Sequence, residues 1–415
     1  MKILEQALNK INLINKKQRD FFIILIQGLI GSVGKKTFRN LARYMQITEH
    51  TFSRQMAKAF DFIGLNTAMI KAAKDDGDVL IAAQDASFIS KSGKKTHGID
   101  FFWNGCASKA EKGLEIDVIA AVKINGDKKE GFTISAEQSP ANPIPKSERK
   151  KKKPTELTEL TKIDFYLNHV RKAASKILEL GIKYIAVDAF LAKNKYVNGV
   201  VELGLHVISK MRKDAQLFRV YDGPQKARGR RKKFDKSKIS FEDFKDSSVV
   251  KIDDEQVELR SCIVYSVSLK RLIKAVWVKK IIDANKYGEA FLFSTDTEMD
   301  TLRIYQFYVA RFQIEFIFRD AKGFTGLTDC QSRDARRLHY HFNASLTALN
   351  IAKLQDNELQ KKAEVRHPFS MANWARKYHV DIIINRFISM FGLDQTLIKL
   401  HPGYNDMLTF GNVRH

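Results

Sequence analysis

Apolar residues change their spacing at about residue 79, from a helical period to short continuous runs. Within residues 1–75 they recur every three or four positions, which predicts helices only. After that point the runs DVLIAAQDAS, GLEIDVIAAVKI and GFTISAEQ are typical of strands and predict a meander of three strands. We therefore expect an all-α N-terminal domain followed by a region that contains a sheet.

The next part of the chain alternates between helix and strand. Residues 155–180 have helical spacing, and IKYIAVDAF at 182–190 predicts a buried strand. A helix is expected from about Lys193, and a further strand, HVISKMRKD, from 206. A strand, a helix and a strand in this order suggest a parallel crossover, so the middle of the chain is predicted to be α/β.

Residues 215–290 interrupt this alternation. They contain the basic run KARGRRKKFDKSK and then the alternating runs QVELRSCIVYSVS and KAVWVKKII, which predict antiparallel strands with a basic tip. We interpret this segment as a β-rich insertion, after which the α/β pattern resumes at EAFLFSTD. The predicted boundaries are 1–75 for the helical domain, 76–214 and 291–350 for the two parts of the α/β domain, 215–290 for the insertion and 351–415 for a C-terminal helical region.

The segment YVARFQIEFIFRDAK, residues 308–322, predicts one amphipathic helix. One stripe of apolar residues is expected to pack: Tyr305, Val309, Phe312 and Phe316. An adjoining face carries a different set: Tyr308, Arg311, Glu315, Arg319 and Lys322. A capping box at Thr295 and Glu298 and a terminator at Gly323 predict the ends of the helix. The second face could bind a ligand, or it could be a solvated ladder of ion pairs.

Composition narrows the choice of partner. The 415 residues are 44% hydrophobic and carry a formal net charge of +24, which favours a polyanionic partner, with nucleic acid ahead of an acidic membrane surface. Cys106, Cys262 and Cys330 form no C-x-x-C pair and suit a reducing cytosol. The apolar run FFIILIQGLIG is too short to span a bilayer and predicts a core helix.

Two segments are candidates for contact with nucleic acid. TFRNLARYMQITEHTFSRQMAKAF, residues 37–60, has the rhythm of a helix-turn-helix, in which Ser53, Arg54 and Lys58 could read DNA. Any three-helix bundle can produce the same pattern. SPANPIPKSERKKKKP, residues 139–154, holds four prolines and six Lys or Arg residues. It could be a solvated tether or a contact to the phosphate backbone, and the sequence leaves both open.

Three carboxylates could meet at one place. Asp85 and Asp188 each end an apolar strand, and ligands gather at strand ends in open α/β sheets. Glu315, from a helix on that sheet, would complete a set of three hard oxygen ligands for magnesium. Two such ions about 4 Å apart serve in-line phosphodiester chemistry. A lone Asp at a strand end is more often a turn former, so the interpretation rests on the combination.

These residues carry a resemblance to a known family. Tyr308, Arg311, Glu315 and Lys322 reproduce the Y-(2)-R-(3)-E-(6)-K signature of the DDE transposases of bacterial cut-and-paste insertion sequences, which the chain resembles over about residues 79–350. The resemblance implies an α/β fold, an RNase H-like mixed sheet with flanking helices, interrupted by a β-rich insertion and preceded by an all-α domain. The helical domain at 1–75 is more loosely similar to the family's DNA end-binding domain.

The resemblance also implies roles for individual residues. Asp85, Asp188 and Glu315 would be the catalytic metal ligands for two Mg²⁺ ions, with Mn²⁺ as a substitute. DNA phosphates would be held by Tyr308, Arg311 and Lys322. Further candidates for DNA contact are Arg319, Arg212, Trp277 and Arg54. Trp277 could stack an extruded base, although a tryptophan in an alternating strand is more often part of a core.

The expected function is DNA transposition. The protein would cleave double-stranded DNA at the terminal inverted repeats of its own element and join the 3′-hydroxyls to target DNA, as a homodimer in the DNA complex. The expected location is the bacterial cytoplasm, at the nucleoid, with no membrane partner. Two alternatives stay open: an RNase H-like metal-dependent nuclease or resolvase without strand transfer, and a non-catalytic DNA-binding regulator.

Overall fold

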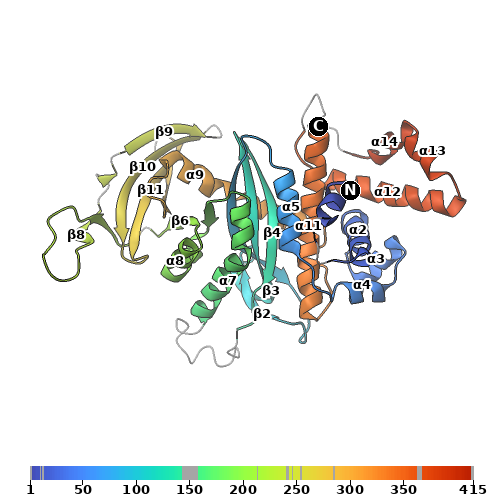
Figure 1. Ribbon diagram of the computed structural model, residues 1–415, viewed down its shortest axis with the longest axis horizontal. Coiled ribbons are helices and arrows are strands. Elements are labelled where there is room, and N and C mark those ends of the chain that lie inside the picture. The colour runs from blue at the N-terminus through green and yellow to red at the C-terminus, as the bar shows by residue number, and fades with distance from the viewer. Residues whose placement is uncertain are drawn as a thin grey trace.

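A mixed sheet of twelve strands runs through the molecule (Figure 1). The computed structural model describes residues 2–9, 11, 14–142, 158–212, 214–239, 243–244, 246–252, 255–283, 286–361 and 367–412. The basic segment predicted as a tether or phosphate contact, 139–154, lies outside the described residues from position 143 onward.

The amino end is helical, as predicted. Its helices are α1 (Lys2–Asn9), α2 (Lys16–Gly31), α3 (Phe38–Met45), α4 (Glu49–Gln55) and α5 (Phe62–Ala72). α3 ends at Gln46, which adopts a left-handed conformation, and α4 starts after Thr48, whose side chain accepts the N–H of Thr51. The rhythm of two helices with a break between them is confirmed, while its role on DNA stays a prediction.

The antiparallel part of the sheet comes first in the chain. Its strands are β1 (Val79–Ser90), β2 (Asp100–Asn104), β3 (Lys109–Asn125) and β4 (Lys128–Gln138). β3 pairs with β1 on one side and with β2 and β4 on the other. The predicted meander is confirmed as β1, β3 and β4, and β2 was missed. The prediction that Asp85 ends its strand is wrong, because the residues after it continue β1 by pairing with the start of β3, as far as Ser90 with Gly113.

Asparagine side chains from α11 (Ala335–Gln360) satisfy the outer edge of β4, which pairs with no strand among the described residues. Asn343 accepts the N–H of Ala136 at 2.9 Å and donates to its carbonyl at 2.9 Å. Asn350 makes the same pair of bonds to Thr133, at 2.9 and 2.8 Å. The two asparagines are two helical turns apart and share a face, so one helix closes the sheet edge without burying unsatisfied backbone groups.

The parallel part of the sheet follows α7 (Thr158–Glu179). It consists of β5 (Tyr184–Val187), α8 (Asn194–Glu202) and β6 (His206–Met211). β5 pairs parallel with both β1 and β6, which confirms the predicted crossover. In Figure 1, α7 and α8 lie beside these central strands, while α5 and α11 lie at the end of the sheet that β4 forms.

The antiparallel strands predicted for 215–290 are present. They are β7 (Leu217–Val220), β8 (Phe234–Lys238), β9 (Asp246–Ile252), β10 (Glu255–Ser266), β11 (Arg271–Asp283) and β12 (Lys286–Ser294). β12 pairs with β6, so these strands continue the central sheet instead of forming a separate one. The proposed domain boundaries therefore fall inside a continuous sheet, and the division into domains stays a prediction.

The single helix predicted over 308–322 is wrong. The structure has two helices, α9 (Thr301–Ala310) and α10 (Gln313–Phe324), with a break at Arg311 and Phe312. The predicted ends are wrong as well. Asp300 caps α9, while Thr295 is buried and its hydroxyl accepts the N–H of Val207 in the sheet. The left-handed glycine after α10 is Gly326, with φ of 75°, and not Gly323.

The predicted packing stripe on this segment is also wrong. Phe312 and Phe316 are 49% and 43% exposed. The residues that pack are Ile304, Phe307, Ala310, Ile314, Ile317, Phe318 and Ala321. The buried positions Ile304, Phe307, Arg311, Ile314, Phe318 and Ala321 keep helical spacing through the break, so the predicted stripe was drawn on a neighbouring face. The exposed rings cover guanidinium groups instead: Arg311 lies 5.4 Å from the Phe312 ring and Arg319 lies 4.9 Å from the Phe316 ring.

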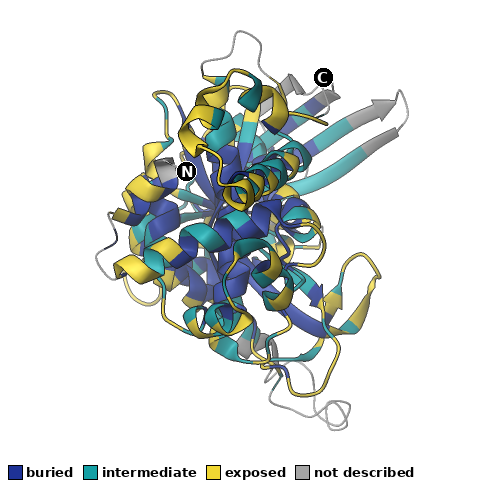
Figure 2. Ribbon diagram, turned by 90° about the vertical axis from the view of Figure 1, so that its right-hand side faces the viewer, coloured by how far each residue is buried: buried dark blue, intermediate teal, exposed yellow. Residues whose placement is uncertain are grey.

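The carboxyl end forms α12 (Met371–Phe391), α13 (Gln395–Leu400) and α14 (Gly403–Leu408). α12 packs closely on α2 at Gly31, where a Cβ would lie 2.7 Å from Ile382 Cδ1 and 2.8 Å from the backbone of Tyr378. Buried residues gather at the centre of the molecule and exposed ones on the outer helices (Figure 2). Over the described residues, none of the helices combines the length and the apolar character that a membrane span requires.

Candidate active site

The parallel pairing of β1 with β5 brings Asp85 and Asp188 together. In this ladder Gln84 lies beside Val187, and continuing the register by one residue places the two aspartates side by side. Their side chains then point to the same face, from strands about 4.8 Å apart. Asp188 follows the last residue of β5 and caps the 3₁₀ helix η1 (Ala189–Leu191), because its Oδ1 accepts the N–H of Leu191 at 3.2 Å.

Arg311 contacts one carboxylate from the sheet, Asp85, and one from α10, Glu315. Its Nη1 lies 3.1 Å from Asp85 Oδ2 and its Nη2 lies 3.8 Å from Glu315 Oε1. The Arg311 side chain is only 8% exposed, whereas that of Glu315 is 48% exposed. Its Nε is buried and has no hydrogen-bond partner among the described residues. The break between α9 and α10 thus holds a buried cation against the sheet, with one donor group unused.

Lys322 and Tyr308 complete this face of the sheet. Lys322 Nζ donates to Ser87 Oγ at 2.8 Å and to the carbonyl of Phe88 at 3.0 Å. Ser87 is two residues after Asp85 and so points to the same side of β1. Tyr308 is partly buried beside Arg311, whose guanidinium lies 5.7 Å from its ring. Burial raises the pKa of the Tyr308 hydroxyl, so it stays a hydrogen-bond donor at neutral pH.

The ionised form of Asp85 is destabilised in this arrangement. Burial raises its pKa to about 6, against the opposing effect of Arg311, and the nearby Asp188 carboxylate raises it further. A cation at this position would favour the ionised form, because it would offset both the burial and the repulsion between the two aspartates.

The pH dependence of stability should report on Asp85. Its pKa in the folded protein lies above the ordinary value, so the native state binds the proton more tightly and loses stability as pH rises from about 4 to about 6. Asp85→Asn should remove this loss and stabilise the metal-free protein at pH 8 by about 1 to 3 kcal/mol. Urea unfolding in EDTA at pH 5 and pH 8 measures the difference.

The matched control for this experiment is Asp222→Asn, at an exposed position outside the site. It should change the free energy of unfolding by less than about 0.5 kcal/mol at either pH. An Asp85→Asn effect that is the same at pH 5 and at pH 8 would contradict the raised pKa.

A buried polar cluster on the opposite face of the sheet holds the residue that precedes Asp85. Gln84 Nε2 donates to Asp117 Oδ2 at 2.6 Å, and Gln84 Oε1 accepts from the hydroxyl of Tyr196. The other partner of Asp117 is His169 Nδ1, at 2.6 Å. Burial raises the pKa of Asp117 and lowers that of His169 to about 4, so the imidazole is neutral at pH 7. This cluster was not identified from the sequence. The available signal was Gln84 and Asp117, two polar residues inside apolar strand runs.

The remaining candidates lie in different surroundings. Arg319 is 68% exposed and 2.9 Å from Asp320, and Arg212 is 82% exposed and 3.0 Å from Asp214. Arg54 is exposed on α4. Trp277 is 4% exposed and pairs across the sheet with residues of β10 and β12. A stacking role for Trp277 would therefore require its ring to leave the core.

The carboxylates fit a divalent cation only in part as they stand. Across the described residues, no three His, Cys, Asp or Glu side chains already form a metal-binding group. The adjacent Asp85 and Asp188 are suitable hard ligands, and a cation between them would offset the burial and the mutual repulsion that raise the pKa of Asp85. Glu315 lies 3.8 Å from Arg311 and its side chain is 48% exposed, so its place with the two aspartates in a metal site stays a prediction.

A family model described as "DDE superfamily endonuclease" matches residues 4–262, more than half of the chain. The chain belongs to the DDE superfamily of endonucleases. This family acts on DNA and generally uses divalent metal ions, in agreement with the site and with the mixed α/β fold. The match to the DDE superfamily includes Asp85 and Asp188 but ends before Glu315, so the third carboxylate rests on signature spacing and geometry. A search of curated proteins gave no match.

Proposed function

We propose that this DDE superfamily endonuclease is a transposase. It cleaves the ends of its own insertion sequence and joins the resulting 3′-hydroxyls to target DNA. The observation that supports the proposal is the convergence on one sheet face of paired aspartates, a helix-borne glutamate and phosphate-binding groups, joined through Arg311. The helical domain at 1–75, with Arg54, would recognise the terminal inverted repeats, and a homodimer would hold two ends together.

The three carboxylates, Asp85, Asp188 and Glu315, would hold two Mg²⁺ ions, for which Mn²⁺ can substitute. Bound there, the ions would lower the pKa of the attacking water or hydroxyl and stabilise the leaving oxygen. For Glu315 to take part, its ion pair with Arg311 has to open, which frees the Nη2 group of Arg311 for the DNA.

Arg311, Tyr308 and Lys322 would position the scissile phosphate. A guanidinium can bind two phosphate oxygens at once, and the Nε of Arg311 has no partner among the described residues. Tyr308 offers a protonated hydroxyl, and Lys322 an ammonium group anchored on Ser87. Since all three approach from the side of Asp85, they fix the phosphate over the carboxylates and neutralise its charge.

Both steps are displacements at phosphorus. In the first, water attacks the phosphodiester at the element end, and the departing oxygen becomes a 3′-hydroxyl. In the second, this hydroxyl attacks a phosphodiester of the target, and the target's own 3′ oxygen leaves. One ester bond forms as another breaks in the second step, so joining needs no external energy source.

The products of the reaction test the proposal. Full-length protein with Mg²⁺, a DNA fragment carrying the sequences that flank its reading frame, and a target plasmid should yield joined DNA. The family description names an endonuclease, so cleavage without joining is the alternative. Free ends alone would favour the nuclease, and binding in EDTA without any cleavage in Mg²⁺ would favour the regulator. The absence of inverted repeats beside the reading frame would also count against transposition.

A further inference from the structure

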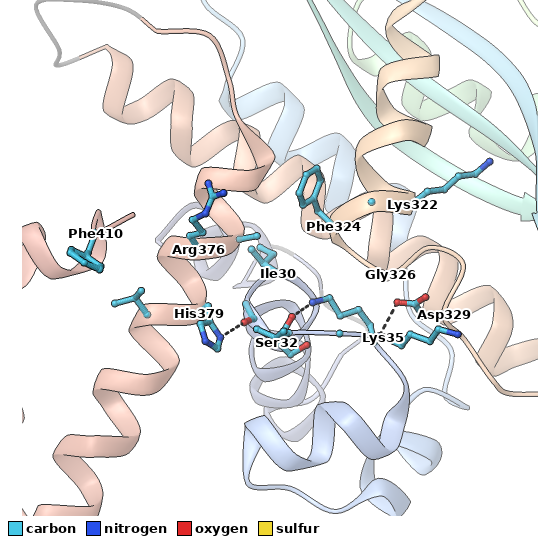
Figure 3. A pocket seen from close by; sticks show the side chains of 17 residues that line it. Ile30, Ser32, Lys35, Lys322, Phe324, Gly326, Asp329, Arg376, His379 and Phe410 are labelled. Carbon is cyan, nitrogen blue, oxygen red and sulfur yellow. Dashed lines mark hydrogen bonds between the residues drawn. The ribbon is translucent and has the colours of Figure 1, made fainter. Parts of the chain in front are cut away.

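A basic pocket lies next to the candidate active site, and of its lining residues the mechanism above uses only Lys322. It has a volume of about 570 Å³ and lies between residues 30–36, the end of α10 with the turn after it, and α12. Figure 3 shows His379 on α12 pointing to the Ser32 loop and Arg376 on the same helix, with Asp329 beyond the loop and the ammonium end of Lys322 directed away from the cavity. Segments from both ends of the chain and from the catalytic helix thus build one cavity.

The charge of this pocket is unbalanced. Its lining contains four Lys or Arg side chains, Lys35, Lys36, Lys322 and Arg376, against one carboxylate, Asp329. Within the described part of the chain, none of the four forms an ion pair with a carboxylate. A second pocket of similar volume, about 600 Å³, is lined by two Lys and two acidic residues. The first pocket therefore has an excess of positive charge that the second pocket lacks.

Lys36 is the most unusual of these cations. It is 6% exposed, and its ammonium group donates to the carbonyl of Ser32 instead of to a carboxylate. Asp329 Oδ2 accepts the main-chain N–H of Lys36 at 2.8 Å, so the only acidic group of the lining is committed to the backbone. Burial lowers the pKa of Lys36 to about 8. An anion in the pocket would offset the burial of this charge.

The pocket is connected to the catalytic face through α10. Lys322 lines it, and the ammonium of Lys322 is bound to Ser87, two residues from Asp85. Glu315 and Lys322 are separated by seven helical residues, or about 10 Å along the axis.

We propose that this pocket binds a backbone phosphate of the DNA next to the segment that enters the carboxylate site, through Lys35 and Arg376, which are exposed, and Lys36, which is buried. The inference rests on the proposed function, since it takes DNA at the carboxylates as given. The pocket then acts as a second phosphate-binding site, which fixes the position of the DNA relative to the metal site.

Salt dependence of DNA binding tests the pocket. The full-length Lys35→Ala/Arg376→Ala double variant should bind a 30-bp duplex of arbitrary sequence, in EDTA, with a slope of log K against log salt that is smaller by about 1.8, or 0.9 for each lost contact. The control, Lys128→Ala/Lys399→Ala, removes two exposed lysines that do not line the pocket and should leave the slope within about 0.5 of wild type. An unchanged slope in the pocket variant, or equal losses in both, would overturn the inference.

Neutral phosphates locate the contact. On a duplex that carries the element end, single methylphosphonates are placed at successive positions from the cleavage site. At one of these positions the substitution should weaken binding by wild type and have no further effect on the pocket variant. If the pocket variant loses binding of inorganic phosphate or of a free nucleotide but keeps the DNA slope of wild type, the pocket serves a small phosphate ester and the DNA assignment is wrong. Binding of poly-glutamate that depends on Lys35 and Arg376 but leaves bound DNA in place would also overturn the inference.

Folding and catalysis are checked separately. Lys35 and Arg376 are exposed, so thermal unfolding of the double variant should match wild type, and the single Lys35→Gln variant should reduce the slope by about 0.9 if the double variant proves unstable. Cleavage in Mg²⁺ is assayed in parallel. Wild type that shows the pocket-dependent slope but never cleaves would refute the proposed function alone. Wild type that cleaves while the pocket variant keeps its slope would refute the pocket alone.

Discussion

Glu315→Gln is expected to lower the rate of DNA end cleavage by about 1,000-fold or more while leaving DNA affinity within about threefold of wild type. The substitution keeps the shape of the side chain but removes the charge that a divalent cation requires. Its structural cost should be small, because the Glu315 side chain is 48% exposed and its ion pair with Arg311 is long, at 3.8 Å. Single-turnover cleavage at saturating DNA, with affinity measured in EDTA, separates the two effects.

Glu298→Gln is the matched control for this experiment, since it removes an exposed carboxylate upstream of α9 and should keep full activity. Asp188→Asn should lose activity as Glu315→Gln does, because both would be ligands of the same ions. Retention of cleavage by Glu315→Gln would exclude this residue from the metal site. In that case another residue would have to complete the metal site with Asp85 and Asp188, which the family match includes.

Arg311→Gln should reduce single-turnover cleavage by about 100-fold to 1,000-fold, the usual cost of losing one preorganised charge-stabilising group. Its guanidinium is buried against Asp85 and would turn its unused donor toward the phosphate. Arg311→Lys should recover only about tenfold of this loss, because an ammonium cannot bind two oxygens in a fixed plane. The readout is the cleavage rate at saturating DNA, together with the melting temperature of each variant.

Arg319→Gln provides the comparison for Arg311. Arg319 lies eight residues further along the chain, is 68% exposed and pairs with Asp320, so its loss should cost less than about tenfold. Equal losses in the Arg311 and Arg319 variants would indicate a general contribution of positive charge. In that case Arg311 would have no special position over the carboxylates.

The pairing of the two aspartates could be predicted from the sequence, but the reason was partly wrong. Asp188 does follow the end of β5, whereas Asp85 lies within β1. They still meet, because the parallel ladder sets which residues are neighbours, wherever each strand ends. The strand type and the crossover follow from local apolar runs, which is why this part of the fold could be predicted.

Contacts between distant segments account for what could not be predicted. Apolar and charged residues continue at helical spacing through 305–322, and nothing local marks the break at Arg311. The residue that occupies the break is held by Asp85, more than two hundred positions earlier in the chain. In the same way, Asn343 and Asn350 look like ordinary polar residues of a helix, and only the edge of β4 explains their burial. Tertiary contacts overrode the local pattern in both cases.

The ladder between β1 and β5 has a consequence for how this chain can change over evolutionary time. Backbone hydrogen bonds, and not the length of the intervening chain, set the separation of Asp85 and Asp188. Insertions and deletions between the two strands can therefore accumulate without moving one carboxylate relative to the other. A one-residue slip of β5 against β1, in contrast, would turn the neighbour of Asp85 to the opposite face. Selection should accordingly tolerate variation in the connecting segments and act strongly on the few residues that keep this register.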